Sequence, residues 1–367
     1  MRPRYLLPVA VATAAARSLT WPGTDDSSPA PLSRSPHAYT NAVSDTNLSK
    51  SIYDIISESE RGRRFTELLE SHHGLQNRLS DDGQSLTVFV PVDDAFRRLN
   101  GLMRSDEEVS IREVLEYHVL GGRYSLDDLA GARTLSTMLE EQDLDRQAQR
   151  IHVGVGASGV EINFYSRVIG SDSIVGANGV VHFLDDVLIP PPRHDRLIAA
   201  SPSLGTFSKA LRISGASEEV RDHLGGVTVF APTDEAWAAL GLDVNAFLFS
   251  EEGRVYLNAL VRYHILIGEV VYTDDMEDEE GLFPTMLAGA SVSVDMGPLK
   301  RLRDDEGMEG VRDVPARDGV VHVVDEVLFP SGGDDGGVPG VPGVPGGVEE
   351  VRRRLGRFVD GFESFEL

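Results

Sequence analysis

Two Tyr-His pairs, Tyr117-His118 and Tyr263-His264, place a phenol beside an imidazole and are the first candidates for a functional role. Such a pair forms either an exposed recognition element or a buried pair whose hydrogen bonds are satisfied at a helix end. Apolar residues precede both pairs at helical spacing, as Val114 and Leu115 do in the first copy. The spacing favours a pair that ends a packed helix over an exposed recognition element.

Two His-Asp pairs, His182 with Asp185 and His322 with Asp325, have the i, i+3 spacing that suits metal ligands on a helix. The surrounding Gly-Val-Val-His pattern predicts strands instead, and residues three apart on a strand face opposite sides of the sheet. The acidic run 274–280 lacks the glycine-turn spacing of a calcium loop, so we expect a solvated loop there. The sequence therefore predicts neither a metal nor a cofactor.

Motifs for nucleophilic or metal catalysis do not occur in this sequence. It contains no Gly-x-Ser-x-Gly elbow, no His-Glu-x-x-His and no phosphate loop. The absence of cysteine also removes thiol catalysis and thiolate metal sites. We expect a protein that is not an enzyme, and a hydrolase or small-ligand-binding protein of the secretory pathway is the alternative from another class.

Composition limits both the size class and the partners of the chain. Its 367 residues, 41% of them hydrophobic, are enough for two core-forming domains. The formal net charge of -25 repels phosphate backbones and anionic lipid headgroups. Nucleic acid is therefore excluded as an expected partner.

The amino-terminal residues read as a secretory leader. Basic residues, an apolar stretch from Leu6 to Ala16 and small residues predict a signal peptide over 1–20, with an uncleaved anchor as the alternative. Residues 21–46 are rich in Ser, Pro and Thr and predict a flexible leader. Asn47 begins an Asn-Leu-Ser acceptor triplet for a possible N-glycan. We expect a secreted protein, or alternatively one of the vacuolar or endomembrane lumen.

The body of the chain is duplicated. The block 87–96, which contains Phe89, Pro91 and Asp93, returns at 228–237 with Phe230, Pro232 and Asp234. The block 179–190 returns at 319–330, again roughly 140 positions later. This period is too long for solenoid repeats and predicts two domains, 47–192 and 193–330, that fold independently on either side of a proline connector.

Each copy has helical patterns in its first half and strand patterns in its second, which indicates an α+β fold. Asn178-Gly179 and Asp318-Gly319 are hairpin-turn signals before the last strand. The repeated aromatic and histidine residues stand in apolar contexts, so we expect most of them to be buried: Phe89, His118, His182, Phe230, His264 and His322.

The ordered blocks resemble the fasciclin domain family, because the Thr-Val-Phe-x-Pro-x-Asp block, the Tyr-His pair and the Gly-Val-Val-His-x-x-Asp block each occur twice. The resemblance implies two tandem domains, each a seven-stranded β-wedge flanked by helices, without general catalytic activity. It also implies cell adhesion or matrix or cell-wall association, with protein or glycan ligands as partners. In animal relatives the family links the Tyr-His motif to integrin binding, but this sequence contains no Arg-Gly-Asp.

The segments after the second copy differ from the rest of the chain. Residues 331–347 contain three Val-Pro-Gly triplets and predict an extended linker. Residues 348–367 show helical periodicity and predict an amphipathic helix. This helix either contacts a partner or a membrane interface, or docks on its own second domain.

Overall fold

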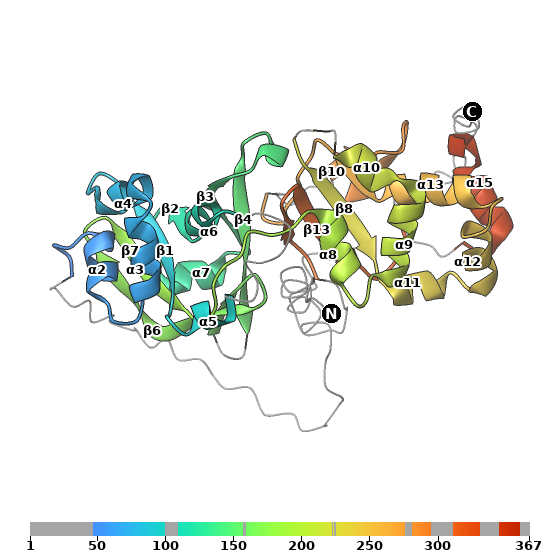
Figure 1. The fold of residues 1–367 in the computed structure, drawn as a ribbon. Coiled ribbons are helices and arrows are strands. Elements are labelled where there is room, and N and C mark those ends of the chain that lie inside the picture. Colours follow the sequence, from blue (N-terminus) through green and yellow to red (C-terminus); the bar gives the residue numbers. More distant parts are fainter. Residues whose placement is uncertain are drawn as a thin grey trace, which may run out of the picture.

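A computed structural model describes residues 47–99, 109–156, 159–221, 223, 225–275, 281–294, 311–330 and 345–359 (Figure 1). The predicted signal peptide, the leader 21–46, positions 331–344 of the predicted linker and positions 360–367 of the predicted terminal helix lie outside the described residues. The two sequence copies form two α+β units side by side, as the duplication and the alternation of patterns predict.

Helices of the first domain begin where serine residues supply caps. Ser51, Ser110 and Ser125 each accept a hydrogen bond from the backbone of the third helical residue, and an acidic side chain at that residue bonds back. Such capping boxes satisfy the free N–H groups of a first turn. The helices are α2 (Ile52–Glu58), α3 (Arg63–Glu70), α4 (His73–Ser80), α5 (Ala95–Leu99), α6 (Ile111–Tyr117) and α7 (Leu126–Gly131).

Seven strands of the first domain close into a barrel in sequence order. The first and last strands pair in parallel, with Phe89 opposite His182. Both are buried along their whole length, which explains their continuous apolar runs. The strands are β1 (Leu86–Pro91), β2 (Val119–Gly121), β3 (Thr134–Glu140), β4 (Ala148–Gly156), β5 (Gly159–Ile162), β6 (Ser166–Gly176) and β7 (Gly179–Leu184).

In the described residues, the second domain begins in the same order as the first, with helices followed by a buried strand, and differs after it. Its described strands form a sheet in the order β12-β13-β8-β9 and a two-stranded sheet, β10-β11. The helices are α8 (His194–Ala200), α9 (Gly205–Ser214), α10 (Ala216–Val220), α11 (Asp234–Ala239), α12 (Leu242–Leu248) and α13 (Arg254–Tyr263). The strands are β8 (Val227–Pro232), β9 (Ile265–Ile267), β10 (Gly281–Pro284), β11 (Ser291–Val294), β12 (Val314–Ala316) and β13 (Gly319–Val324).

Glycines at the starts of β7 and β13 permit the parallel pairing in both domains. A Cβ on Gly179 would lie 2.0 Å from the carbonyl oxygen of Leu86, and one on Gly319 would lie 1.8 Å from that of Val227. Gly319 also has a φ of +148°, which side-chain-bearing residues rarely adopt. The glycine of each turn signal is therefore required by the close approach of the neighbouring strand.

The terminal helix α15 (Val348–Val359) docks on the second domain. Val351, Leu355 and Val359 join the apolar core of that domain, and α15 lies against α12 and α13 (Figure 1). Arg352 forms an ion pair with Glu252 and its guanidinium lies 5.0 Å from the centre of the Phe247 ring. Of the alternatives that the sequence left open for this helix, the structure shows docking on its own domain.

A polar interface joins the two domains between β4 and the segment that follows β9. The Asp274 carboxylate accepts hydrogen bonds from the backbone of Arg133 and Thr134, and Asp275 forms an ion pair with Arg150 at 2.8 Å. Arg150 also lies 4.5 Å from the centre of the Tyr272 ring. Asp274 and Asp275 are exposed, as expected of a solvated loop, and their carboxylates also bond to polar groups of the other domain. Residues 276–280 of the acidic run lie outside the described residues.

Candidate functional site

The histidine of each Tyr-His pair connects a helix end to the chain that follows the last strand. His118 Nδ1 donates to the Val114 carbonyl at 2.7 Å, and its Nε2 accepts from the Leu188 backbone N–H at 2.9 Å. His264 repeats both bonds, with the Leu260 carbonyl at 2.8 Å and the Leu328 N–H at 2.9 Å. Both imidazoles are fully buried, so neither presents a recognition surface.

This geometry requires a neutral imidazole. Because a carbonyl only accepts and a backbone N–H only donates, Nδ1 carries the proton and Nε2 does not. Burial lowers the pKa of His118 and of His264 to about 4, although the bond to the helix carbonyl opposes the shift. Both ring nitrogens are thus occupied, and neither imidazole is free to transfer a proton to a ligand.

The hydroxyls of both tyrosines of the pairs also bond to the protein's own backbone. Tyr117 is the last residue of α6, and its hydroxyl donates to the Arg150 carbonyl at 3.1 Å while it accepts from Asn163 at 2.8 Å. Tyr263 ends α13, and its hydroxyl donates to the Ser291 carbonyl at 3.2 Å. Burial raises the pKa of Tyr263 to about 12. Each phenol therefore connects its helix to the strands behind it.

The second histidine of each copy packs against the signature phenylalanine. The rings of Phe89 and His182 lie 5.8 Å apart, and those of Phe230 and His322 lie 5.6 Å apart. His182 Nε2 donates to the Tyr124 carbonyl, and His322 Nε2 donates to the Val271 carbonyl. Burial lowers the pKa of both histidines, so these are neutral core side chains too.

The signature aspartates cap a helix that lies earlier in the chain. Asp93 accepts from the backbone N–H of Arg64 at 3.0 Å, in the first turn of α3. Asp234 accepts from Thr206 N–H at 2.7 Å, in the first turn of α9. A carboxylate at a helix N-terminus satisfies free N–H groups and favours the helix dipole. Pro91 and Pro232 are buried at the ends of β1 and β8.

The aspartates that follow the last strands do not join the histidines. Asp185 accepts from the backbone N–H and the Nε of Arg167, whereas Asp325 is exposed. Over the described part of the chain, no three His, Cys, Asp or Glu side chains are grouped to hold a metal ion. Asn47 is half-buried just before α2, and its glycosylation stays a prediction.

Sequence reasoning missed the polar residue that precedes each turn glycine. Asn178 is fully buried, accepts from Ile52 N–H at 2.7 Å and donates to the Leu79 carbonyl at 2.8 Å. Asp318 instead accepts from the backbone of His194 and binds its Nδ1 at 2.7 Å. Both residues also cap the first helix of their domain. Because each stands before a glycine, the sequence pattern indicated only a turn and gave no sign of this second role.

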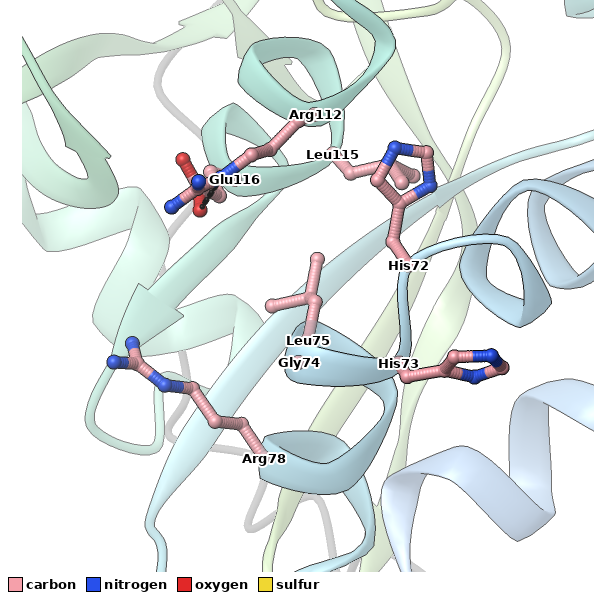
Figure 2. A pocket seen from close by; sticks show the side chains of 8 residues that line it. All are labelled: His72, His73, Gly74, Leu75, Arg78, Arg112, Leu115 and Glu116. Carbon is pink, nitrogen blue, oxygen red and sulfur yellow. Dashed lines mark hydrogen bonds and ion pairs between the residues drawn. The ribbon is translucent and has the colours of Figure 1, made fainter.

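A groove opens on the surface of the first domain between α4 and α6, with a volume of about 310 Å³ (Figure 2). Leu75 and Leu115 form its apolar floor, and both are buried. Figure 2 shows Leu75 between the two helices, with Arg78 on one side and His73 on the other. A second hollow of about 550 Å³ continues toward β3 and shares Arg78, Arg112 and Glu116 with the first. We call these two hollows together the α4–α6 groove.

Fold and site together define a class of protein: a duplicated α+β domain whose repeated polar residues support the core, with an open groove between α4 and α6 of the first copy. The family model for the fasciclin domain matches residues 61–190 and 202–330, one match per domain. The chain therefore belongs to the fasciclin domain family, as the doubled motifs predict. Fasciclin domains occur in adhesion and extracellular-matrix proteins and are generally not catalytic.

Relatives with this domain come from fungi and animals. A protein of Gibberella zeae named "Aurofusarin biosynthesis cluster protein S" is 24% identical over 85% of this chain and 83% of its own length. Periostin of Homo sapiens is 28% identical over 73% of this chain, and stabilin-1 of Homo sapiens is 28% identical over 74%. This chain spans only 31% of periostin and 11% of stabilin-1.

Among solved structures, a fasciclin domain pair of an insect cell adhesion molecule, fasciclin I, matches 73% of this chain at 20% identity, with a TM-score of 0.35. In the described residues no helix is both long and apolar enough to cross a membrane.

Proposed function

We propose that this protein is a non-enzymatic interaction protein of the secretory pathway, whose two fasciclin domains hold partners at the cell surface, in the matrix or in the cell wall. One observation carries the proposal. The repeated imidazoles and phenols, which are the residues best suited to chemistry, bond to the protein's own backbone in both domains. What remains for function is the outer surface.

The arrangement of the domains supports a role in holding partners. Contacts such as Arg150 with Asp275, and Gln149 with the Ala316 carbonyl at 3.0 Å, tie the domains to each other. A paired scaffold presents surfaces of both domains in a defined relation, which benefits binding because less motion must be lost. The proline connector 190–192 is short, which agrees with a closely coupled pair.

Localisation and attachment of the full-length protein test this function. We expect a carboxy-terminally tagged chain to enter the secretory pathway, and the purified protein on a plate to retain cells or cell-wall material. Retention in the vacuolar or endomembrane lumen would instead support the lumenal alternative. A cytosolic location, or hydrolysis of generic ester and glycoside substrates by the purified chain, would contradict the proposal.

A second candidate function is favoured by the extent of one match. The Gibberella zeae protein aligns over most of both chains, whereas the animal proteins are much longer than this chain. We infer from this that an accessory role beside biosynthetic enzymes, again without catalysis, is the second candidate. Deleting the protein in its own host separates the two: altered secreted small molecules with normal attachment favour the accessory role, and the reverse favours adhesion.

A further inference from the structure

The two domains follow one another head to tail, so each has a leading end and a trailing end. The first helices, α2 and α8, lie at the leading ends, and the helices of the Tyr-His pairs, α6 and α13, lie toward the trailing ends (Figure 1). The leading end of the second domain meets the trailing end of the first (Figure 1). The terminal helix α15 lies at the trailing end of the second domain. The two trailing ends therefore have different neighbours.

The Tyr-His pairs relate the two trailing ends residue by residue. Tyr117 and Tyr263 end α6 and α13, and their numbers differ by 146. The same offset places Ala259 of α13 where α6 has Glu113. Residues 256, 259 and 263 have the spacing of one helix face, as do residues 110, 113 and 117. These two faces are therefore equivalent surfaces of the duplicated fold.

The second domain covers the trailing end of the first. Glu113, on this face of α6, forms an ion pair with Arg317, in the turn before β13, at 3.7 Å. Burial raises the pKa of Tyr117, and Tyr272 of the second domain contributes to the shift. Phe164, in the turn between β5 and β6, packs against the apolar core of the second domain. The trailing end of the first domain is thus a surface on which another fasciclin domain docks.

α15 covers the equivalent face of the second domain. Just before α13, Glu252 forms an ion pair with Arg352 of α15 at 2.6 Å. At the end of α13, burial raises the pKa of Tyr263 to about 12, and the nearby Arg357 of α15 opposes this rise. Ala259 lies on α13 between these two contacts and is completely buried. α15 therefore takes, on the second domain, the place that the second domain takes on the first.

Aromatic side chains lie beneath α15. Phe247 and Phe329 are buried, and the guanidinium groups of Arg352 and Arg354 lie 5.0 and 5.8 Å from the centres of their rings. The ring of Tyr256 lies 5.4 Å from that of Phe247. Aromatic side chains dominate the centres of protein–protein interfaces, and a large exposed apolar patch marks an interaction site. The surface beneath α15 therefore has the composition of a docking surface.

The leading end of the first domain is the counterpart of the surface that docks between the two domains. It lies at the outer end of the pair, away from the second domain (Figure 1). The turns before β7 and β13 align through Gly179 and Gly319, so Ala177 stands where the second domain has Arg317. In a second molecule, this end can approach the trailing end of the second domain as the second domain approaches the first.

Charge also favours this contact between molecules. Arg123 is exposed at the leading end of the first domain, and its guanidinium bonds to the Ala177 carbonyl. Within the described residues, no carboxylate forms an ion pair with Arg123. At the trailing end of the second domain, Glu252 has only Arg352 of α15 as its described ion-pair partner and loses it when α15 leaves. The two ends then carry opposite charges.

We propose that the trailing end of the second domain is a docking surface for the leading end of the first domain of another copy, and that α15 occupies this surface as an intramolecular cap. The full chain is then monomeric, because a tethered helix acts at a high effective concentration. Without α15, each molecule has one free trailing end and one free leading end, so the contact is heterologous and assembly proceeds head to tail. The inference goes beyond the proposed function, since it names a self-association that α15 controls.

Sedimentation velocity over a concentration series tests the proposal. The full chain should remain monomeric, whereas the average mass of a chain ending at Pro330 should rise with concentration. Leu355→Asp places a charge on the buried face of α15, so the full chain with this substitution should associate as well. Arg353→Asp introduces the same side chain on the exposed face of α15 and should stay monomeric.

A synthetic peptide of residues 345–359 separates specific docking from loss of folding. The peptide should return the chain ending at Pro330 to the monomer, because it occupies the free trailing end, whereas an unfolded and aggregated second domain would not respond. Three outcomes would each overturn the proposal: a shortened chain that is monomeric at every concentration, a full chain that associates as strongly as the shortened one, or an association that the peptide does not reverse.

Cross-linking identifies which ends meet. The chain contains no cysteine, so single cysteines can be placed in the shortened chain. By correspondence with Glu113 and Arg317, a bismaleimide linker should join Ala259→Cys of one molecule to Ala177→Cys of another. Arg97→Cys, at an exposed position of α5, is the matched control and should not be joined to Ala259→Cys. Links between two Ala259→Cys molecules, with none to Ala177→Cys, would contradict the head-to-tail contact. Attachment to cells or cell wall is measured separately, so either result leaves the proposed function to its own test.

Discussion

The two domains share their buried hydrogen bonds and differ in what covers the helix face of α6 and α13. In both, a histidine at a helix end bonds to a backbone N–H beyond the last strand, and an aspartate after the first strand caps an earlier helix. The second domain adds α15 and the Arg262–Glu219 bonds, whereas the first keeps an open groove. Duplication has preserved the interactions that support the core, while the surfaces have become different.

Removing the signature phenylalanine tests whether both cores depend on it equally. Phe89 and Phe230 are both buried, so Phe89→Ala and Phe230→Ala should each cost about 3–5 kcal/mol of unfolding free energy. Urea unfolding of the full chain, followed by a probe in each domain, measures the two losses. If the unfolding free energy fell in one domain only, the phenylalanine would support the core of that copy and not of the other.

Truncation before α15 removes the helix that distinguishes the second domain. Burying a Leu or Val side chain stabilises by about 1.5–3 kcal/mol, and the ordering of the helix offsets part of the gain from Val351, Leu355 and Val359. We expect residues 193–330 to unfold cooperatively, but about 2–4 kcal/mol less stably than residues 193–359, which share the same start and the His194–Asp318 bond. Equal stability of the two fragments would show that α15 docks without supporting its domain.

Acid should destabilise both domains through the neutral histidines. The folded pKa of His118, His152 and His264 is about 4, below the usual 6.5, so the unfolded chain binds protons first as the pH falls. Stability is therefore complete above pH 6.5 and is lost between pH 6.5 and 4, by roughly 3 kcal/mol per histidine. The first domain has two of these three groups, but burial also raises the pKa of Glu141 to about 7, which stabilises that domain as the pH falls from 7 to 4.5. The melting temperatures of the two domains should therefore fall with pH to a similar extent.

Replacing the helix-end histidines separates support from recognition. His264→Ala and His118→Ala should each cost about 1–3 kcal/mol, because the Leu328 or Leu188 N–H loses its acceptor. His223→Ala, at an exposed histidine, is the matched control and should leave stability unchanged. An unaltered melting transition in His264→Ala, together with lost attachment to cells or matrix, would instead identify a recognition residue.

The smallest expected effect lies at the interface between the domains. Arg150→Ala removes the contact with the Tyr272 ring and the ion pair with Asp275, which together should cost about 1 kcal/mol in a partly exposed setting. Arg146→Ala, which removes the exposed pair with Glu140, is the comparison. If Arg150→Ala is as neutral as its comparison, the domains are coupled through other contacts.

The sequence by itself determined the duplication, the α+β class and the family, because repeated blocks and hydrophobic periodicity report the local structure of each segment. It also placed Tyr117 and Tyr263 at helix ends, since apolar spacing shows which side of a helix is buried. Only the tertiary structure decided what such residues bond to. His118 accepts a hydrogen bond from the Leu188 N–H seventy positions away, and Arg262 of α13 bonds to Glu219 of α10. Such partners depend on how elements that are distant in the sequence pack together, and a local sequence pattern contains no information on that packing. For the same reason, the docking of α15, the interdomain bonds of Asp274 and Asp275 and the groove between α4 and α6 are visible only in the folded chain.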